Sequence, residues 1–408
     1  MNVLTGTISR MAACTALTLT AAAALSAAAA HPAAAAITSG LGGPVVAVED
    51  PGNSLDMFWQ VNGTAYYPGQ VYHTSLGSEA PAWVAAGVGF WRVADGGSTF
   101  SAPSVVNSGQ STLIAAQGAN HSLDFYWSPD AYWWGAATVP HFTREVVAGP
   151  DTTYSAPQLI VADGRVDIVS AGPDDTLDFY SAASGQAFSP GTPATVIGGP
   201  GTTWSQPSIA SDGYGLVVAA LGLHGPVDVY WGTYAGKFGA ADVIDPSVTG
   251  PASPFYSFSA PSVTAFGGWV TVVYQGSTAS LAMWSALVNA TRWYFGAGHF
   301  SAGSWVELPA PPTSGTIASA PQATWSQGYL DIAATGFAGD VSYWRMDASG
   351  MHFQVALKPG TSYGAWPTIT PNNGGINIET QDSSGEVFYS WQRLGAPAWG
   401  QEQWSQAR

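Results

Sequence analysis

Apolar and polar residues alternate in a short segment that recurs along the chain. In its clearest copy, Ser122–Trp127, the apolar residues Leu123, Phe125 and Trp127 alternate with polar positions such as Asp124. A period of two places the two sets of side chains on opposite faces of a β-strand. The pattern therefore predicts a strand with a carboxylate on one face. Six further copies begin at Ser54, Thr176, Pro226, Ser280, Asp340 and Glu386.

Three other patterns accompany most copies. A Ser-Ala-Pro segment, as in Ser101–Val105, comes first, and an apolar run, as in Leu113–Ala116, follows it. A β-prone segment, as in Arg144–Val147, comes last. Proline cannot donate to a sheet ladder and is confined to strand starts and edge strands. We therefore expect the Ser-Ala-Pro segment to begin an innermost edge strand, with the other segments forming the second, third and fourth strands.

Four strands in each of seven repeats, without helical periodicity, predict an all-β fold, a seven-bladed β-propeller of four-stranded antiparallel blades. Repeats of about 50 residues fit this architecture. The ring is expected to close by packing of the first blade on the last, without a shared sheet. The predicted blades are residues 33–98, 99–151, 152–201, 202–253, 254–313, 314–360 and 361–408.

The first blade departs most from the repeat. Its predicted first strand, at 33–40, lacks the Ser-Ala-Pro segment, and Val45–Val48 and Leu55–Trp59 are its predicted second and third strands. It carries an insertion at 80–91, and the fifth blade carries another at 289–294. Departures from a repeat are places where function concentrates.

The first 30 residues have the pattern of a secretory signal peptide. Arg10 precedes an apolar stretch, Met11–Leu25, and a run of small residues follows. We expect cleavage before His31 and an extracellular location for residues 31–408, the single propeller domain. An uncleaved membrane anchor is the alternative. The one cysteine, Cys14, lies in this segment, so the mature chain is expected to have no disulfide.

Composition narrows the range of partners. Only 9% of the 408 residues are charged, and the formal net charge is −16. Such a surface repels phosphate backbones and anionic membranes, so we expect no nucleic acid partner. The mature chain has no second long apolar run, and we expect no membrane insertion. A hydrophobic content of 46%, with 18 Trp, indicates a large packed core.

The recurring strand supplies the candidate ligand-binding residues. Its carboxylates suit the hydroxyl groups of sugars, and its indole rings suit the apolar faces of pyranose rings. We predict that the ligand-binding residues are Asp56, Trp59, Asp124, Trp127, Asp178, Asp228 and Trp231. In the alternative interpretation, the carboxylates form internal hydrogen bonds to an adjacent blade's loop and the rings pack between blades.

Catalytic and metal-binding signatures are lacking. A glycosidase needs two carboxylates facing one bond, and no local pattern pairs Asp163, Asp167 or other acidic residues. There is no Gly-x-Ser-x-Gly elbow, no His-Glu-x-x-His and no calcium-binding loop. We therefore predict no catalytic residue, no metal ligand and no cofactor.

The Gly118–Trp127 hairpin and the Ser101–Val105 strand, repeated along the chain, carry a family resemblance. They resemble the PLL-like bacterial β-propeller lectins and, more distantly, tachylectin-type propellers, over roughly residues 37–408. The resemblance implies a propeller fold and the binding of fucose or other glycans through loops that vary between members.

These features favour a secreted, non-enzymatic, lectin-like propeller with repeated sites, whose partners are glycans or cell-surface polysaccharide. Weak repeated sites gain avidity when they are presented together. One alternative is a protein-interaction or surface scaffold, which predicts large exposed apolar patches on one face. Another is a polysaccharide hydrolase or lyase, which predicts a single acidic pocket beside an insertion.

Overall fold

The computed structural model describes residues 46–49, 55–61, 70–76, 91–94, 98–108, 111–128, 142–185, 188–211, 213–223, 225–244, 257, 259–276, 279–287, 304–307, 316–347, 350–357, 366–372, 375–381, 387–393 and 399–404. All of these residues belong to the compact unit Gly40–Arg408. The predicted signal peptide, the insertion at 289–294 and most of that at 80–91 lie outside the described residues. In the described part of the chain, no helix is both long and apolar enough to cross a membrane.

Strands dominate the described residues and form seven antiparallel four-stranded sheets, named one to seven in chain order. Sheet one contains β1 (Val46–Glu49), β2 (Leu55–Val61), β3 (Gln70–Leu76) and β4 (Trp91–Arg92). Sheet two contains β5 (Ser104–Ser108), β6 (Ser111–Gln117), β7 (Leu123–Ser128) and β8 (Thr143–Ala148). Sheet three contains β9 (Gln158–Ala162), β10 (Arg165–Ala171), β11 (Leu177–Ala183) and β12 (Thr195–Gly198). Sheet four contains β13 (Ser208–Ser211), β14 (Leu216–Leu221), β15 (Val227–Gly232) and β16 (Asp242–Ile244).

The remaining sheets follow the same plan. Sheet five contains β17 (Ser262–Phe266), β18 (Trp269–Gln275), β19 (Leu281–Leu287) and β20 (Ser304–Glu307). Sheet six contains β21 (Gln322–Ser326), β22 (Tyr329–Thr335), β23 (Val341–Asp347) and β24 (Gly350–Leu357). Sheet seven contains β25 (Thr368–Asn372), β26 (Gly375–Gln381), β27 (Val387–Arg393) and β28 (Gly400–Trp404). Single 3-10 turns, η3 (Ala119–His121) and η4 (Pro173–Asp175), connect the second and third strands of sheets two and three.

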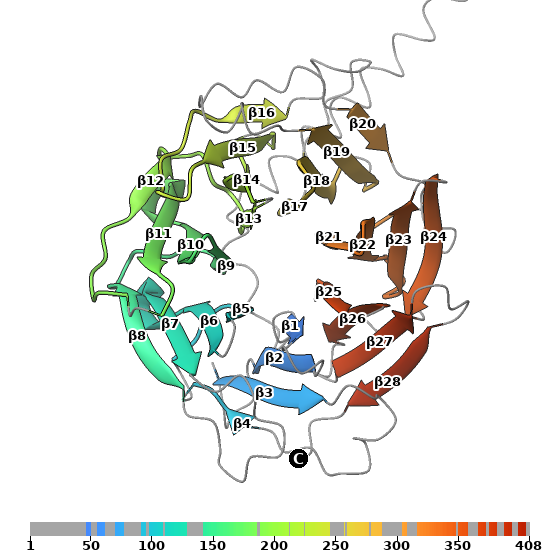
Figure 1. Ribbon diagram of the computed structural model, residues 1–408, viewed down its shortest axis with the longest axis horizontal. Helices are drawn as coiled ribbons and strands as arrows, with labels where there is room; N and C mark the ends of the chain where they lie inside the picture. Colours follow the sequence, from blue (N-terminus) through green and yellow to red (C-terminus); the bar gives the residue numbers. More distant parts are fainter. Residues whose placement is uncertain are drawn as a thin grey trace, which may run out of the picture. The chain divides into compact units, whose positions relative to one another are not determined.

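The first strands of the sheets lie side by side around a common centre (Figure 1). Each of β1, β5, β9, β13, β17 and β21 contacts the next of these strands, and β25 contacts β1. Because each sheet is built from consecutive strands, sheets one and seven share no strand. Within the described residues, sheets one and seven therefore meet by packing, as the sequence predicts.

The proline segments mark the innermost strands. In sheets two to seven, the first strand begins at the residue after a proline, as in Ser104 after Pro103. This strand pairs with another strand of its sheet on one side only, so its other edge faces the neighbouring first strands. Three serines that follow the proline each accept a hydrogen bond from a backbone N–H in the next sheet. These pairs are Ser104 with Leu159 (2.9 Å), Ser208 with Val263 (3.0 Å) and Ser262 with Ala323 (3.1 Å).

The hydrophobic core lies between neighbouring sheets rather than at the centre of the ring. On β7, Leu123 and Phe125 pack in one cluster with Ile168 of sheet three. On the opposite face of β7, Tyr126 packs in a separate cluster with Ile114. A strand that is buried on both faces requires apolar residues at successive positions, which explains the high hydrophobic content of the chain.

The strand order of sheet one differs from the predicted order. The run Val45–Val48 was expected to form the second strand and Leu55–Trp59 the third, but β1 and β2 are the first and second strands of the sheet. The reason is that later residues supply two further strands. The β-prone segment Gln70–Leu76 pairs with β2 along seven residues, and Trp91–Arg92 adds a short fourth strand. Consequently, Asp56 on β2 does not occupy the strand position of Asp124 on β7.

Candidate functional site

The predicted carboxylates of sheets two to four lie beneath the turn between the second and third strands. Asp124, Asp178 and Asp228 are all buried. Each lies against a turn glycine; a Cβ atom added to Gly118, for example, would be 2.3 Å from Oδ2 of Asp124. Burial raises the pKa of all three carboxyl groups, that of Asp228 to about 6. These positions therefore need a glycine in the turn to accommodate the carboxylate.

Asp124 has partners within its own sheet. Arg144 on β8 donates from Nε at 2.9 Å and lies with Nη2 at 2.7 Å from Oδ2. Ser122 donates to Oδ1 at 3.2 Å. The burial of Asp124 raises its pKa, and the ion pair with Arg144 lowers it. These contacts match the internal alternative, except that the partner is a strand of the same sheet rather than an adjacent loop. Ligand binding by Asp124, Asp178 and Asp228 stays a prediction.

The predicted tryptophans lie between sheets. The indole N–H of Trp127 donates to Oε1 of Glu145 at 2.9 Å. Oε2 of Glu145 accepts from the backbone N–H of Phe188, in the connection between β11 and β12, at 2.9 Å. Trp231 packs against the apolar cluster between sheets four and five. Asp124 and Trp127 lie on opposite faces of β7, so the structure does not bring this predicted pair together. The side chains of Asp56 and Trp59 lie outside the described residues.

The strand position of Trp127 distinguishes the sheets. Trp127 on β7 pairs with Leu113 on β6, and Trp231 on β15 pairs with Val217 on β14 in the same way. In sheets three, five and six, polar residues occupy both positions of the pair. These pairs are Asp167 with Ser181, Thr271 with Ser285 and Asp331 with Arg345. At this strand position, the face that sheets three, five and six turn toward the next sheet is therefore polar. The same position in sheets two and four is apolar.

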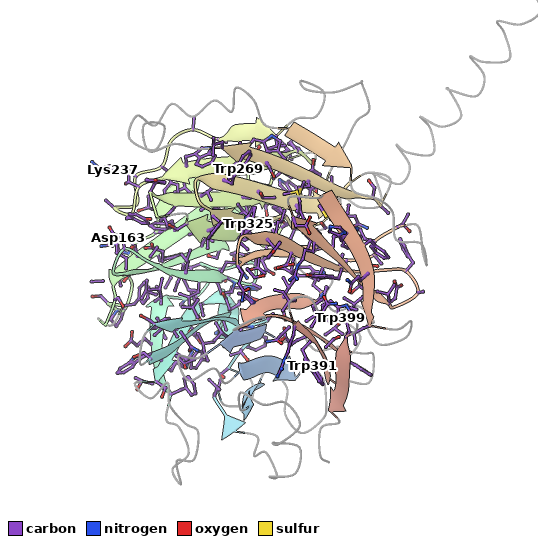
Figure 2. The ribbon with its side chains drawn as sticks, turned by 45° about the vertical axis from the view of Figure 1, so that its right-hand side comes forward. Asp163, Lys237, Trp269, Trp325, Trp391 and Trp399 are labelled. Carbon is purple, nitrogen blue, oxygen red and sulfur yellow. The ribbon has the colours of Figure 1, made fainter. Side chains whose placement is uncertain are left out.

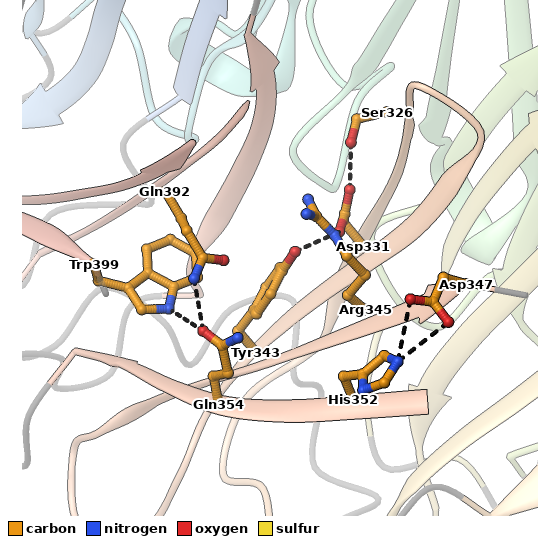
Figure 3. Close-up of polar contacts among 9 residues, drawn as sticks. All are labelled: Ser326, Asp331, Tyr343, Arg345, Asp347, His352, Gln354, Gln392 and Trp399. Carbon is orange, nitrogen blue, oxygen red and sulfur yellow. Dashed lines mark hydrogen bonds and ion pairs between the residues drawn. The ribbon is translucent and has the colours of Figure 1, made fainter. Parts of the chain in front are cut away.

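The richest polar group lies between sheets six and seven (Figure 3). Asp331 on β22 is buried and accepts hydrogen bonds from three side chains. Ser326 at the end of β21 donates to Oδ2, while Tyr343 and Arg345 on β23 donate to Oδ1 at 2.5 and 2.6 Å. We call Ser326, Asp331, Tyr343 and Arg345 the Asp331 network. The hydrogen bond and ion pair fix the direction of the guanidinium group.

One terminal nitrogen of Arg345 lacks a hydrogen-bond partner among the described residues. Its side chain is 13% exposed, and Nη2 has no hydrogen-bond partner within the described part of the chain. The guanidinium carbon lies 5.3 Å from the ring centre of Tyr329 and 5.7 Å from that of Tyr343. Burial opposes the charge of Arg345, but Asp331 raises its pKa overall. A fixed, charged donor between aromatic rings suits an oxygen-rich ligand.

A second set of polar contacts joins sheets six and seven next to this network. Oε1 of Gln354 on β24 accepts hydrogen bonds from Nε2 of Gln392 at 2.9 Å and from Nε1 of Trp399 at 2.8 Å. The Trp399 ring packs edge-on against Tyr343, with 4.9 Å between ring centres (Figure 3). These contacts hold the Trp399 ring of sheet seven against Tyr343 of the Asp331 network in sheet six.

Sheet three carries a related arrangement around Asp167. This residue has the same position on its strand as Asp331 and is also buried. Oδ1 accepts a hydrogen bond from Ser181 and lies 3.9 Å from Nε of Arg165, while Oδ2 has no partner among the described residues. Burial raises the pKa of Asp167 to about 6. The interfaces that follow sheets three and six thus both combine a buried carboxylate on the second strand with an arginine and a serine.

Sequence reasoning missed the Asp331 network. The signal that could have found it is an aspartate within an otherwise apolar second strand, seen in Val166–Val169 and again in Leu330–Ala333. Asp167 was considered only as an unpaired acidic residue. Its neighbour in sequence, Asp163, is an exposed turn residue with φ of 48°.

Solved structures share this fold. The BP39L lectin from Burkholderia pseudomallei aligns with 90% of this chain and 100% of its own, with 15% sequence identity and a TM-score of 0.66. A structure of prolyl endopeptidases aligns with 96% of this chain and 55% of its own, with 13% identity and a TM-score of 0.52. A fucose-specific lectin from Aleuria aurantia aligns with 75% of this chain and 96% of its own, with 11% identity and a TM-score of 0.49.

The similarity to the lectin from Burkholderia pseudomallei shows that the chain has a β-propeller fold of four-stranded antiparallel sheets. No protein-family model matches the chain, and no curated protein matches its sequence.

Proposed function

We propose that the chain is a secreted, non-enzymatic, lectin-like seven-bladed propeller that binds carbohydrate between its blades. The observation that carries the proposal is the unpartnered Nη2 of Arg345 within the Asp331 network. The lectin from Burkholderia pseudomallei supports the proposal, because it has the same fold over its whole length. The PLL-like resemblance of the repeats supports it independently.

The chemistry of the network suits sugar hydroxyl groups. A buried donor without an acceptor costs about 1–3 kcal/mol, so a ligand oxygen that satisfies Nη2 of Arg345 gains that free energy. The Tyr329 ring offers an apolar face beside this donor. Asp331 is held by three donors, so it orients Arg345 instead of serving as an acid or base. We therefore propose binding without bond cleavage.

The related network around Asp167 supports repeated sites. It presents a carboxylate oxygen without a partner, which suits a ligand hydroxyl as donor. We propose that sheets three and six carry the two principal sites, and that sheets two and four do not, because tryptophan fills the corresponding position there.

A glycan array tests the function. Residues 31–408 are screened beside Arg345→Gln, which removes the charged donor, and Lys237→Gln, which removes a charge at an exposed position on sheet four (Figure 2). We expect saturable binding that Arg345→Gln weakens by about tenfold or more and Lys237→Gln leaves unchanged. Equal binding by all three proteins would contradict the site. Binding of no glycan by folded protein would contradict the function.

A further inference from the structure

A cluster of exposed apolar side chains lies on sheets five and six. Phe266, Trp269 and Leu287 are 50%, 44% and 57% exposed. They are cross-strand neighbours, because Phe266 pairs with Trp269 and Trp269 pairs with Leu287. Trp325 of sheet six stacks on Phe266, with 5.6 Å between ring centres and 23° between ring planes. We call these four residues the aromatic platform; Figure 2 labels Trp269 and Trp325.

The described side chains beneath the aromatic platform are uncharged. Next to Trp269 on the same face of β18, Thr271 forms a buried hydrogen bond of 2.9 Å with Ser285. Trp325 packs against the apolar cluster between sheets five and six, and its indole N–H has no partner among the described residues. Exposed aromatic rings that support one another in this way are costly in water and are typical of binding surfaces.

The aromatic platform and the Asp331 network lie on the two faces of sheet six at the same end of β21. Trp325 and Ser326 are consecutive, so their side chains point to opposite faces of the sheet. Trp325 faces sheet five, and Ser326 donates to Asp331 in the network that faces sheet seven. Because neighbouring sheets pack about 10 Å apart, an extended ligand can cross this end of sheet six and reach both.

We propose that the aromatic platform is a second subsite for the ligand of the Asp331 network, and that this ligand is an uncharged oligosaccharide. This inference rests on the proposed function. One sugar unit binds at Arg345, and a later unit stacks its C–H face on Trp269 and Phe266. Acidic polysaccharides are disfavoured, because the four platform residues include no cation, Arg345 is already paired with Asp331, and the net charge of −16 repels them. A cationic sugar is disfavoured by the charged guanidinium of Arg345, so the ligand is uncharged. A monosaccharide is too short to contact both subsites.

Affinity as a function of ligand length tests the inference. The probes are cello-, malto- and chito-oligosaccharides from the monosaccharide to the hexasaccharide, titrated calorimetrically into the full chain. We expect affinity to rise about tenfold with length in one of these series. Trp269→Ala and Phe266→Ala are expected to abolish that rise and to leave monosaccharide binding unchanged. Arg345→Gln is expected to weaken binding at every length.

Phe337→Ala is the matched control, since this phenyl group is 65% exposed on a turn of sheet six outside the platform. It should retain the length dependence. If binding depends on Arg345 but not on ligand length, or if Trp269→Ala retains the length dependence, the platform is not a subsite and the proposed function stands. If no sugar binds to the folded protein, both fail, and the exposed platform then favours the scaffold alternative.

Discussion

Burial raises the pKa of several carboxyl groups in this protein, and the largest consequence is expected at Glu379. Glu379 on β26 is fully buried, with Oε2 accepting a hydrogen bond from Thr368 at 3.1 Å and Oε1 without a partner among the described residues. Burial raises its pKa to about 8. Its carboxyl group is therefore neutral in the folded protein at pH 7 and charged in the unfolded chain.

The raised pKa of Glu379 predicts that stability falls as pH rises. Between about pH 4.5 and 8 the folded state binds one proton more than the unfolded state. The contribution of Glu379 to the free energy of unfolding is therefore complete below about pH 4.5 and is lost as the pH rises to about 8. Glu379→Gln removes the titration, and we expect its free energy of unfolding to depend less on pH. Urea denaturation at pH 5, 6, 7 and 8 measures the effect, with the exposed Asp163→Asn as control. Parallel pH profiles for wild type and Glu379→Gln would contradict the prediction.

At the scale of elements, the serines that follow three of the strand-starting prolines have a structural role. Ser262 of sheet five accepts the backbone N–H of Ala323 in sheet six, on an edge that has no strand partner. Ser104 and Ser208 connect their sheets to the next in the same way. The Ser-Ala-Pro-Ser motif therefore starts a strand and also joins it to the next sheet.

Removal of this hydroxyl group should destabilise the ring. We expect Ser262→Ala to lower the free energy of unfolding by about 1 kcal/mol, because the N–H of Ala323 loses its acceptor. The control is Gln322→Ala, at the position that corresponds to Ser262 in sheet six. Chemical denaturation compares the two variants. A loss of the same size in both would show that the hydrogen bond is not the cause.

The strands were predictable because their signals are local. Alternation placed β7 and β11, and proline placed the starts of β5 and β17. The polar partners were not predictable in this way. Arg144 meets Asp124, and Arg345 meets Asp331, only once the register between strands is fixed. In the first repeat, the short fourth strand begins at the last residue of the insertion, Trp91, where no local signal marks a strand.

The molecule as a whole is a set of unequal interfaces. Tryptophan fills those after sheets two and four, while those after sheets three and six contain a buried aspartate with an arginine. The two candidate sites therefore lie on separate sheets of one chain. Under the proposed function, two weak sites on one chain could engage one polysaccharide at once and so gain avidity.

Closure by packing alone also has a consequence for how the chain acquires its structure. Each sheet is complete as soon as its own residues are available, since no strand is borrowed from elsewhere. The contact between β1 and β25 is different, because it joins the two ends of the described chain and must wait for all the sheets between them. Contacts of such long sequence separation form late and slowly. The final event in folding is therefore expected at this seam, where a partly folded ring would stay open.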